Sequence, residues 1–293
     1  MQLASASQYL VSPALAGILM MRFDISVILL VDVLTMVVTT TCMLVVWRQI
    51  GSQKRVVDTG FWEEFRSGIR FLFGSRGIVV LMMLVTLVTF CMGFLQTLLT
   101  PMLLDLANEE VLGFVRSLAA VGMVLSSLAI GAFGMGRHHL RYMAIALVVS
   151  GISVSLLGAT TSVLLIGVFV FIFFMTLPPL STSVEVLTRS SIPNETQGKV
   201  WGLIGLISQL GYIAAYALSG ILADYVFNPL LRPGGPLAGS IGTVIGVGES
   251  RGIGMMFVVV GVMLVALAFV VPRVRSIQVI EASLDPQTTS CTG

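Results

Sequence analysis

The chain is organised around residues 190–230, SSIPNETQGKVWGLIGLISQLGYIAAYALSGILADYVFNPL. No charged residue lies between Lys199 and Asp224, and a helix needs about 20 apolar residues to cross a hydrocarbon core of about 30 Å. Pro193 ends the preceding helix because it removes a backbone donor, and Asn194 can cap the helix that follows. The stretch therefore predicts a turn followed by a membrane-spanning helix.

Small residues recur at steps of three or four along this helix. They are Gly202, Gly205, Ser208, Gly211, Ala215, Ser219 and Ala223. Such spacing lets a neighbouring helix backbone approach closely. Gln209, Tyr212 and Tyr216 add polar groups at similar spacing. We expect this helix to pack tightly on its neighbours and to line a space within the protein.

The composition of the whole chain is that of a membrane protein. Hydrophobic residues make up 56% and charged residues 10% of the 293 residues, whereas soluble domains carry about 25% charged residues. The net charge of +2 is too small and too dispersed to indicate a nucleic-acid partner. The three cysteines form no disulfide framework and no metal-binding spacing.

Apolar runs separated by polar breaks predict an all-α, polytopic helical bundle of about eight transmembrane helices. The expected spans lie near residues 3–21, 26–47, 77–99, 111–134, 140–158, 162–187, 199–226 and 252–271. Residues 227–251 are rich in glycine and proline, and we interpret them as an extended loop or a shallow re-entrant piece.

Basic residues gather in the loops on one side of the predicted membrane. Placing the loop after the second span in the cytoplasm gives that side Arg48, Lys54, Arg55, Arg66, Arg70, Arg76, Arg137, Arg141, Arg189, Lys199, Arg273 and Arg275. The opposite side has only Arg22, Arg232 and Arg251. Cytoplasmic loops carry such an excess, so both termini are predicted to be cytoplasmic.

The cytoplasmic connection 49–76 carries apolar residues at helical spacing. They are Phe61, Trp62, Phe65, Ile69, Leu72 and Phe73. This pattern predicts an amphipathic helix on the inner membrane surface. A helix that binds a partner protein is the alternative.

Three charged residues fall within the expected spans, where a charge costs about 2.5 to 3.5 kcal/mol on insertion scales. Asp32 is either a proton or cation site or a structural hydrogen-bonding group. Arg116 can extend outward toward nearby acidic residues, which are Asp105, Glu109 and Glu110. Glu185 precedes Arg189 by four residues, the favourable order for an intrahelical pair.

Pro178 and Pro179 are expected to interrupt the sixth span, either as a plain kink or as the broken helix found at transporter sites. Motifs of enzymes are absent from the sequence, which has no phosphate-binding loop, no zinc spacing and no nucleophile elbow. His138 and His139 are a weak candidate for a metal site. No cofactor and no metal are expected.

The order of the spans, the amphipathic connection and residues 192–230 resemble the later part of a major facilitator superfamily transporter, in the branch of bacterial drug, macrolide and siderophore exporters. That family has twelve helices in two halves that rock about a site at the midplane. The resemblance divides the chain into the last two helices of the N-terminal half, a cytoplasmic amphipathic linker, a six-helix C-terminal half and a cytoplasmic tail. These are residues 1–48, 49–76, 77–275 and 276–293.

Two family motifs are present in degenerate form. The exporters carry a GP-x-x-GG pattern in the fifth helix, and here Pro13 and Gly17 match it while Ser12 and Ala16 replace glycines. A second motif, Gly-x-x-x-Asp followed by arginines, corresponds to Gly131, Arg137 and Arg141, with Met135 in place of the acid.

The resemblance implies proton-coupled efflux of an amphipathic, hydrophobic small molecule across a bacterial cytoplasmic membrane, with half of the cavity lined by the third, sixth and seventh spans. The expected substrate contacts are Gln96, Thr97, Gln209, Tyr212 and Tyr216. Asp32 and Glu185 are the candidate proton-coupling groups. We expect the chain to be a fragment that lacks the first four helices of the family and needs them from a longer chain. The alternatives are a truncated protein that does not transport, one half of a partner-dependent carrier, and a membrane-embedded enzyme.

Overall fold

The computed structural model describes residues 25–49, 66, 69–70, 72–74, 76–136, 138–192, 197–239, 242, 246, 248 and 251–283. Within these ranges the chain forms helices and turns and contains no strand. The expected span at 3–21, together with Pro13 and Gly17, lies outside the described residues.

Among the described residues, seven helices are long and apolar enough to cross a membrane. They are α2 (Ile25–Gln49), α4 (Arg76–Leu106), α5 (Glu109–Phe133), α6 (His139–Ala159), α7 (Val163–Ser190), α8 (Gln197–Leu222) and α11 (Arg251–Val270). The all-α, polytopic fold class expected from the sequence is therefore confirmed. A π-helical turn, η1 (Ala223–Phe227), and α9 (Asn228–Leu231) extend α8. A 3₁₀ turn, η2 (Val271–Arg273), leads from α11 into α12 (Arg275–Ser283).

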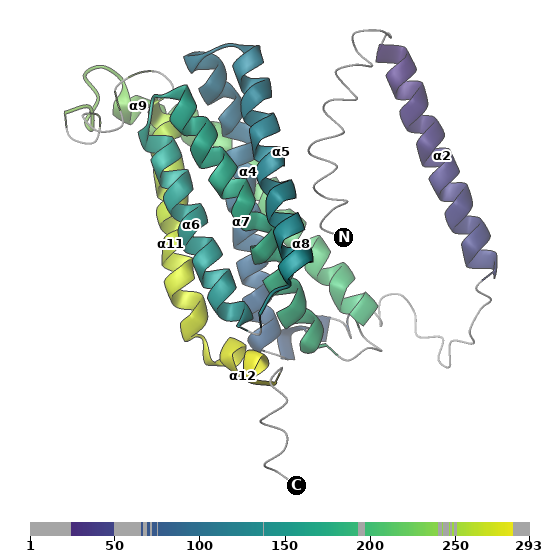
Figure 1. The fold of residues 1–293 in the computed structure, drawn as a ribbon. Coiled ribbons are helices and arrows are strands. Elements are labelled where there is room, and N and C mark those ends of the chain that lie inside the picture. The colour runs from purple at the N-terminus through teal and green to yellow at the C-terminus, as the bar shows by residue number, and fades with distance from the viewer. Residues whose placement is uncertain are drawn as a thin grey trace.

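Six of the long helices pack into one bundle (Figure 1). Helix α8 packs on α4, α4 on α11, α11 on α6, α6 on α7, and α7 on α5. This order places α8 and α5 at the two ends of the series. The main hydrophobic core lies inside the series and includes Phe94, Leu147, Ile166 and Phe257.

The helix termini follow from local sequence. The Asn108 side-chain Oδ1 accepts a hydrogen bond of 3.1 Å from the Val111 N–H at the start of α5. Glu109 and Glu110 follow in the first turn, where negative charge interacts favourably with the helix dipole. Gly134 has a φ of 70° and ends α5 with its N–H bonded to the Ile130 carbonyl, a conformation that glycine adopts without a steric penalty.

Glycines set the contact between α4 and α8. A Cβ at Gly211 would overlap the Thr86 carbonyl oxygen, so only glycine allows this approach. The Thr89 hydroxyl donates a hydrogen bond of 2.8 Å to the Ser208 carbonyl across the same contact. The close approach expected along α8 is thus confirmed at Gly211, whereas Gly202 and Gly205 face open space.

Helices α6 and α11 approach each other even more closely. A Cβ at Gly158 would overlap the Gly254 carbonyl oxygen, and one at Gly261 would overlap the Gly151 carbonyl. Without a hydrophobic force between helices in lipid, association depends on such van der Waals contact between backbones. The pair α6–α11 therefore forms a tight unit on one flank of the bundle.

Helix α7 runs through Pro178 and Pro179 without a break. The broken helix, one of the two alternatives from the sequence, is therefore not found, whereas the plain kink stays a prediction. Serine hydroxyls bond to carbonyl groups beside the prolines. The Ser181 hydroxyl donates to the Leu177 carbonyl at 2.9 Å, and the Ser183 hydroxyl donates to the Pro179 carbonyl at 2.7 Å.

The end of the 49–76 connection packs on the bundle. Leu72 is fully buried in a second hydrophobic cluster with Val200 and Ile204 of α8, and Ile69 packs against that cluster. Phe73 is 60% exposed. The described part of the amphipathic pattern thus contacts protein rather than only the membrane surface; Phe61, Trp62 and Phe65 lie outside the described residues.

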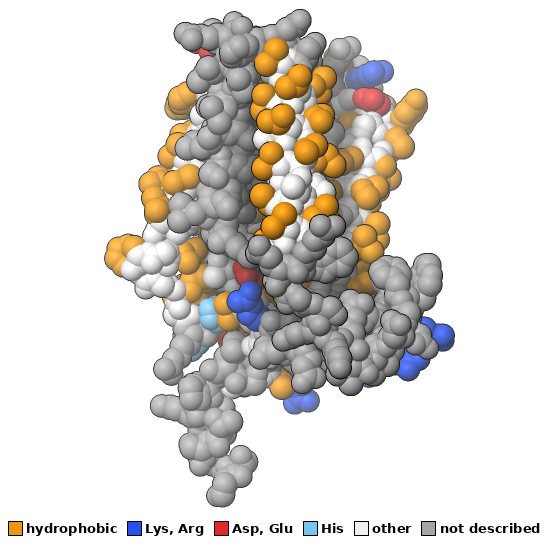
Figure 2. Space-filling view, turned by 90° about the vertical axis from the view of Figure 1, so that its right-hand side faces the viewer, with side chains coloured by type: hydrophobic (Ala, Val, Ile, Leu, Met, Phe, Trp, Pro, Cys, Tyr) orange, Lys and Arg blue, Asp and Glu red, His pale blue; other side chains and the backbone are white. Residues whose placement is uncertain are grey.

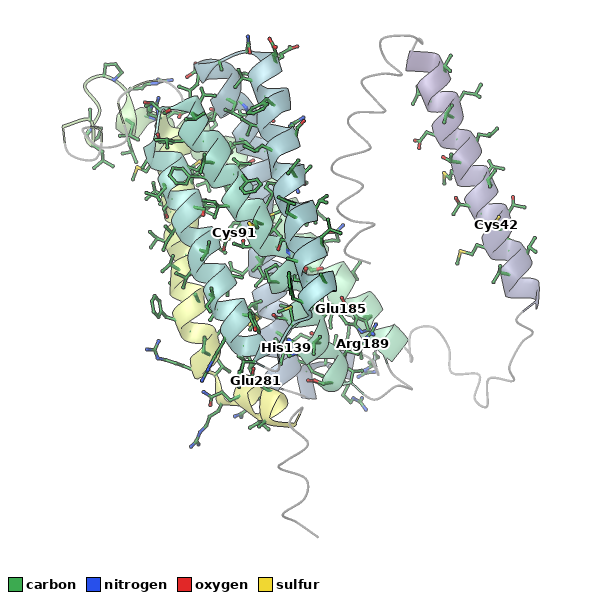
Figure 3. The ribbon with its side chains drawn as sticks, in the orientation of Figure 1. Cys42, Cys91, His139, Glu185, Arg189 and Glu281 are labelled. Atoms are coloured by element: carbon green, nitrogen blue, oxygen red, sulfur yellow. The ribbon has the colours of Figure 1, made fainter. Side chains whose placement is uncertain are left out.

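Helix α12 lies across the end of the bundle where α6 begins (Figures 1 and 3). Ile277 is fully buried, and Glu281 Oε1 accepts a hydrogen bond of 2.9 Å from the Leu140 N–H. The carboxylate satisfies one of the backbone donors that the first turn of α6 leaves free.

Helix α2 stands apart from the bundle (Figure 1), and none of its described side chains is buried. Its surface is apolar on all sides, as expected of a helix that faces lipid or other helices. Figure 2 shows these hydrophobic side chains along α2, with charged side chains gathered mostly toward the two ends of the molecule.

Replacing Gly158 by valine is expected to destabilise the bundle by about 1–3 kcal/mol or more, because the added carbons overlap the backbone of α11. The measurement is the thermal unfolding midpoint of the purified protein in detergent. Gly220→Val on α8 is the control, since a Cβ there meets nothing within 4 Å. Equal midpoints for the two variants would contradict the α6–α11 contact.

Candidate functional site

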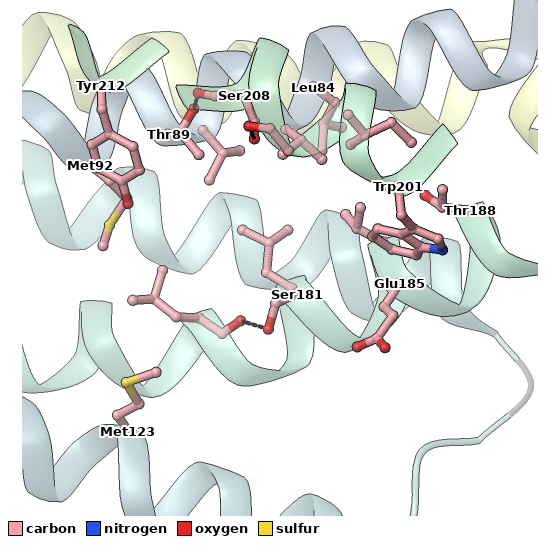
Figure 4. A pocket seen from close by; sticks show the side chains of 17 residues that line it. Leu84, Thr89, Met92, Met123, Ser181, Glu185, Thr188, Trp201, Ser208 and Tyr212 are labelled. Carbon is pink, nitrogen blue, oxygen red and sulfur yellow. Dashed lines mark hydrogen bonds between the residues drawn. The ribbon is translucent and has the colours of Figure 1, made fainter. Parts of the chain in front are cut away.

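A cavity of about 510 Å³ lies among the helices of the bundle. Helices α4, α7 and α8 supply most of its walls, and α5 contributes Met123. These are the third, sixth and seventh spans from which the sequence predicted the cavity wall. Figure 4 shows the cavity with its side chains. Its apolar lining includes Leu84, Val88, Met92, Met123, Leu177 and Leu180.

One carboxylate lies in this cavity, near the end of the bundle that carries α12 (Figures 3 and 4). Glu185 Oε1 is 3.6 Å from Arg189 Nη2, and the two side chains are 37% and 61% exposed. The intrahelical pair expected from the sequence is confirmed. Pairs of this spacing and exposure contribute only about 0.3–0.5 kcal/mol, so the carboxylate can exchange its partner at low cost.

The indole of Trp201 lines the cavity together with Glu185 and Thr188 (Figure 4). It comes from the first turns of α8, and Glu185 comes from the last turns of α7. A large aromatic face beside an acidic group suits an amphipathic, cationic guest, since such a face attracts cations as well as apolar groups.

The hydroxyl groups of the cavity are engaged mainly by their own backbones. Ser208 Oγ donates to the Gly205 carbonyl at 2.9 Å, and Ser181 Oγ donates to the Leu177 carbonyl. Thr89 Oγ1 is bonded to the Ser208 carbonyl. These hydroxyls therefore direct their hydrogen bonds mainly to backbone carbonyls rather than into the cavity.

Three of the predicted substrate contacts lie close together on α4 and α8. The Tyr216 hydroxyl donates a hydrogen bond of 3.0 Å to Gln96 Oε1. The rings of Tyr212 and Tyr216 lie 5.9 Å apart, centroid to centroid, and Tyr212 lines the cavity. The polar side of α8 expected from the sequence therefore continues from the cavity toward Gln96.

A second pocket of about 280 Å³ includes Gln96 and Arg116 in its lining. Arg116 Nη2 donates a hydrogen bond of 2.9 Å to Thr100 Oγ1. The sequence suggested that Arg116 reaches the acidic residues near the start of α5. It contacts Thr100 instead, because α4 and α5 pack with these two side chains facing each other.

The other predicted site residues do not line the cavity. Thr97 bonds to the Gly93 carbonyl of its own helix at 2.9 Å, and Gln209 is exposed without lining the cavity. Asp32 lies on α2, which Figure 1 shows apart from the bundle, and it is not among the residues that line the cavity. Sequence reasoning missed Trp201, Met92 and Met123 as cavity residues; the aromatic residue at the start of α8 was the available signal for Trp201.

In the part of the chain that the structure describes, no group of three His, Cys, Asp or Glu side chains could hold a metal ion. His138 is exposed, and the Nδ1 of His139 is buried without a partner among these residues.

Comparison with known proteins identifies relatives among exporters. Macrolide efflux protein A of Streptococcus pyogenes is 26% identical over 226 residues, which cover 74% of this chain and 55% of the relative. Macrolide efflux protein A of Enterococcus faecalis is 26% identical over 210 residues, which cover 69% of this chain and 64% of the relative. No family model and no solved structure matches.

The chain thus spans about half the length of the Streptococcus relative. The resemblance to macrolide exporters inferred from residues 192–230 is confirmed by these homologues. Together with the seven apolar helices of the described residues, they support a protein that crosses the membrane several times.

A cysteine at Ser181 is expected to react with a water-soluble thiol reagent several-fold faster than one at Ser183, because Ser181 lines the cavity and Ser183 is fully buried. The reaction rate is measured in membranes on a background without the three native cysteines. Both positions lie on α7 two residues apart, so Ser183 is a matched control. Equal rates would mean that water does not enter the cavity.

Proposed function

We propose that this homologue of macrolide efflux proteins is a secondary active transporter. It exports an amphipathic, hydrophobic small molecule, of the macrolide class or similar to it, across a bacterial cytoplasmic membrane in exchange for protons. The observation that carries the proposal is the apolar cavity between α7 and α8 with the single carboxylate of Glu185 in its wall.

The cavity supports a substrate that is recognised mainly by apolar contact. Methionines line it at Met92 and Met123, and the flexible, polarisable methionine side chain adapts to guests of different shape. Trp201 supplies a flat face near the opposite end of the cavity (Figure 4). Such a lining suits a large ring with both apolar and polar surfaces.

Glu185 is the proposed coupling group in this half of the transporter. An ionisable group within a membrane span is a candidate for a proton relay. When protonated, Glu185 loses its attraction to Arg189, 3.6 Å away, and to a basic substrate in the cavity. Proton uptake and substrate release are thereby linked. Asp32 on α2 is the second candidate and would act from the other half.

Substrate leaving the cavity would next meet Tyr212, Tyr216 and Gln96. The Tyr216–Gln96 hydrogen bond is exposed, so both groups can exchange it for a contact with substrate. Arg116 lies in the pocket beyond Gln96. We assign these groups to the outward part of the path.

The proposed orientation places the α12 end of the bundle in the cytoplasm. Arg76, Arg141, Arg273 and Arg275 lie at this end, in agreement with the excess of positive charge on cytoplasmic loops. The prediction from the sequence that both termini are cytoplasmic stays part of this proposal.

A complementary set of helices is the proposed partner of this bundle. Large apolar side chains of α8 are exposed beside the cavity, with Leu206 59%, Leu210 55% and Ile213 61% exposed. A second half that packs on α8 and α5 would cover this surface and close the cavity into a path, as in the two-half transporters that rock about a central site. Transport is therefore measured with the protein at its native length.

Glu185→Gln is expected to reduce proton-driven export to near background, because the amide cannot take up a proton. Export is measured as the accumulation of a radiolabelled macrolide in cells without other exporters, with and without a protonophore. Arg189→Gln, the matched control, is expected to change export less than about twofold, since the lost pair is weak. Unchanged export by Glu185→Gln would remove Glu185 from the mechanism.

Gly205→Leu is expected to abolish export of large substrates while leaving the protein folded. Gly205 lines the cavity, and a Cβ there meets nothing within 4 Å, so the new side chain occupies space meant for substrate. The same accumulation assay and the yield of folded protein are measured. Gly113→Leu on α5, also in open space but outside the cavity, is the control. Equal export by both variants would show that substrate does not pass Gly205.

A further inference from the structure

A groove of about 500 Å³ lies between α6 and α11. Its apolar lining includes Ile145, Val148 and Val149 of α6 and Ala268, Phe269 and Pro272 at the end of α11. It shares no residue with the cavity, whose walls come from α4, α5, α7 and α8. The groove is therefore a separate feature, on the flank formed by the tight α6–α11 pair.

This flank presents apolar side chains to its surroundings. Ile145 is 61% exposed, Phe269 56% and Val270 57%. In a membrane-spanning helix such residues face lipid or another helix. The groove between these side chains is open and follows the two helices. A hydrocarbon chain lying along the bundle would fit it.

Two arginines mark the end of the groove near α12. Arg273 is part of the groove wall. Arg141 lies on α6 four residues before Ile145 and seven before Val148, so it shares their helix face one turn nearer the end. Both arginines are exposed. Arg141 comes from α6, and Arg273 from η2, the turn that follows α11.

The positive charge at this place is not neutralised by the described residues. Arg273 Nη1 donates a hydrogen bond of 2.7 Å to the Phe269 carbonyl, which holds the guanidinium beside the groove. Across the described part of the chain, neither Arg141 nor Arg273 forms an ion pair with a carboxylate. Glu281, the acidic residue of α12, accepts the Leu140 N–H.

We propose that the groove between α6 and α11 binds an anionic phospholipid. One acyl chain lies along Ile145, Val148 and Phe269, and the phosphate of the headgroup contacts Arg141 and Arg273. The guanidinium group matches the geometry of phosphate oxygens, and basic pockets between membrane helices bind anionic headgroups at the cytoplasmic side. The lipid would support the α6–α11 contact from outside. This site does not depend on the proposed transport activity.

The test measures lipid binding to the purified protein at its native length, by native mass spectrometry during titration with dioleoyl phosphatidylglycerol or dioleoyl phosphatidylcholine. Wild type is expected to retain the anionic lipid more tightly. Arg141→Gln and Arg273→Gln are each expected to weaken its binding about fivefold and to leave phosphatidylcholine unchanged. Arg76→Gln is the matched control, since Arg76 is exposed at the start of α4 and outside the groove.

Ala144→Trp tests the apolar part of the site. Ala144 lines the groove, and the indole would occupy the path of the acyl chain. Weaker binding of phosphatidylglycerol is expected. Ile152→Trp, two turns further along α6, 48% exposed in the native chain and outside the groove, is the control and is expected to bind as wild type does.

Three results would overturn the proposal. The first is that wild type retains phosphatidylglycerol and phosphatidylcholine equally. The second is that Arg76→Gln and Arg141→Gln lose phosphatidylglycerol to the same extent. The third is that Ala144→Trp binds phosphatidylglycerol as wild type does. Arg141 makes no side-chain hydrogen bond within the described structure, so Arg141→Gln removes charge without removing such a contact. Its result therefore decides the role of the arginines even if Arg273→Gln destabilises α11.

Discussion

Contact between helix backbones at glycine is the interaction on which this bundle depends. In hydrocarbon there is no hydrophobic force to bring helices together, so close packing has to hold them. Gly211 brings α8 onto α4, and Gly158 and Gly261 bring α6 onto α11. Because α4 also packs on α11 and α6 on α7, these contacts fix the order of the series.

The two flanks of the bundle therefore differ in chemistry. The open side combines methionines, an indole and one carboxylate around the cavity of α4, α7 and α8. The α6–α11 side is closed by backbone contact and offers apolar side chains with arginines at one end. In the proposed transporter, the cavity flank would change its contacts during each cycle while the α6–α11 flank stays in lipid.

Sequence patterns predicted the features that depend on local spacing. The spans from α2 onward, the small-residue contact at Gly211 and the Glu185–Arg189 pair all follow from residues three or four apart on one helix. The sequence patterns failed to predict contacts that depend on how helices far apart in the sequence pack together. Met123 lines the cavity and Arg116 bonds to Thr100, and neither contact is visible in a helical repeat. The prolines of α7 allowed either a kink or a broken helix, and the helix continues through both of them.

Helix α12 makes the beginning of α6 dependent on a distant part of the chain. The Leu140 N–H bonds to Glu281, 141 positions away in the sequence, and Ile277 is buried beside it. The segment after the last span is therefore not freely exchangeable. A chimera that joins this bundle to the tail of a relative would have to preserve an acceptor at position 281, or the first turn of α6 would lose its partner.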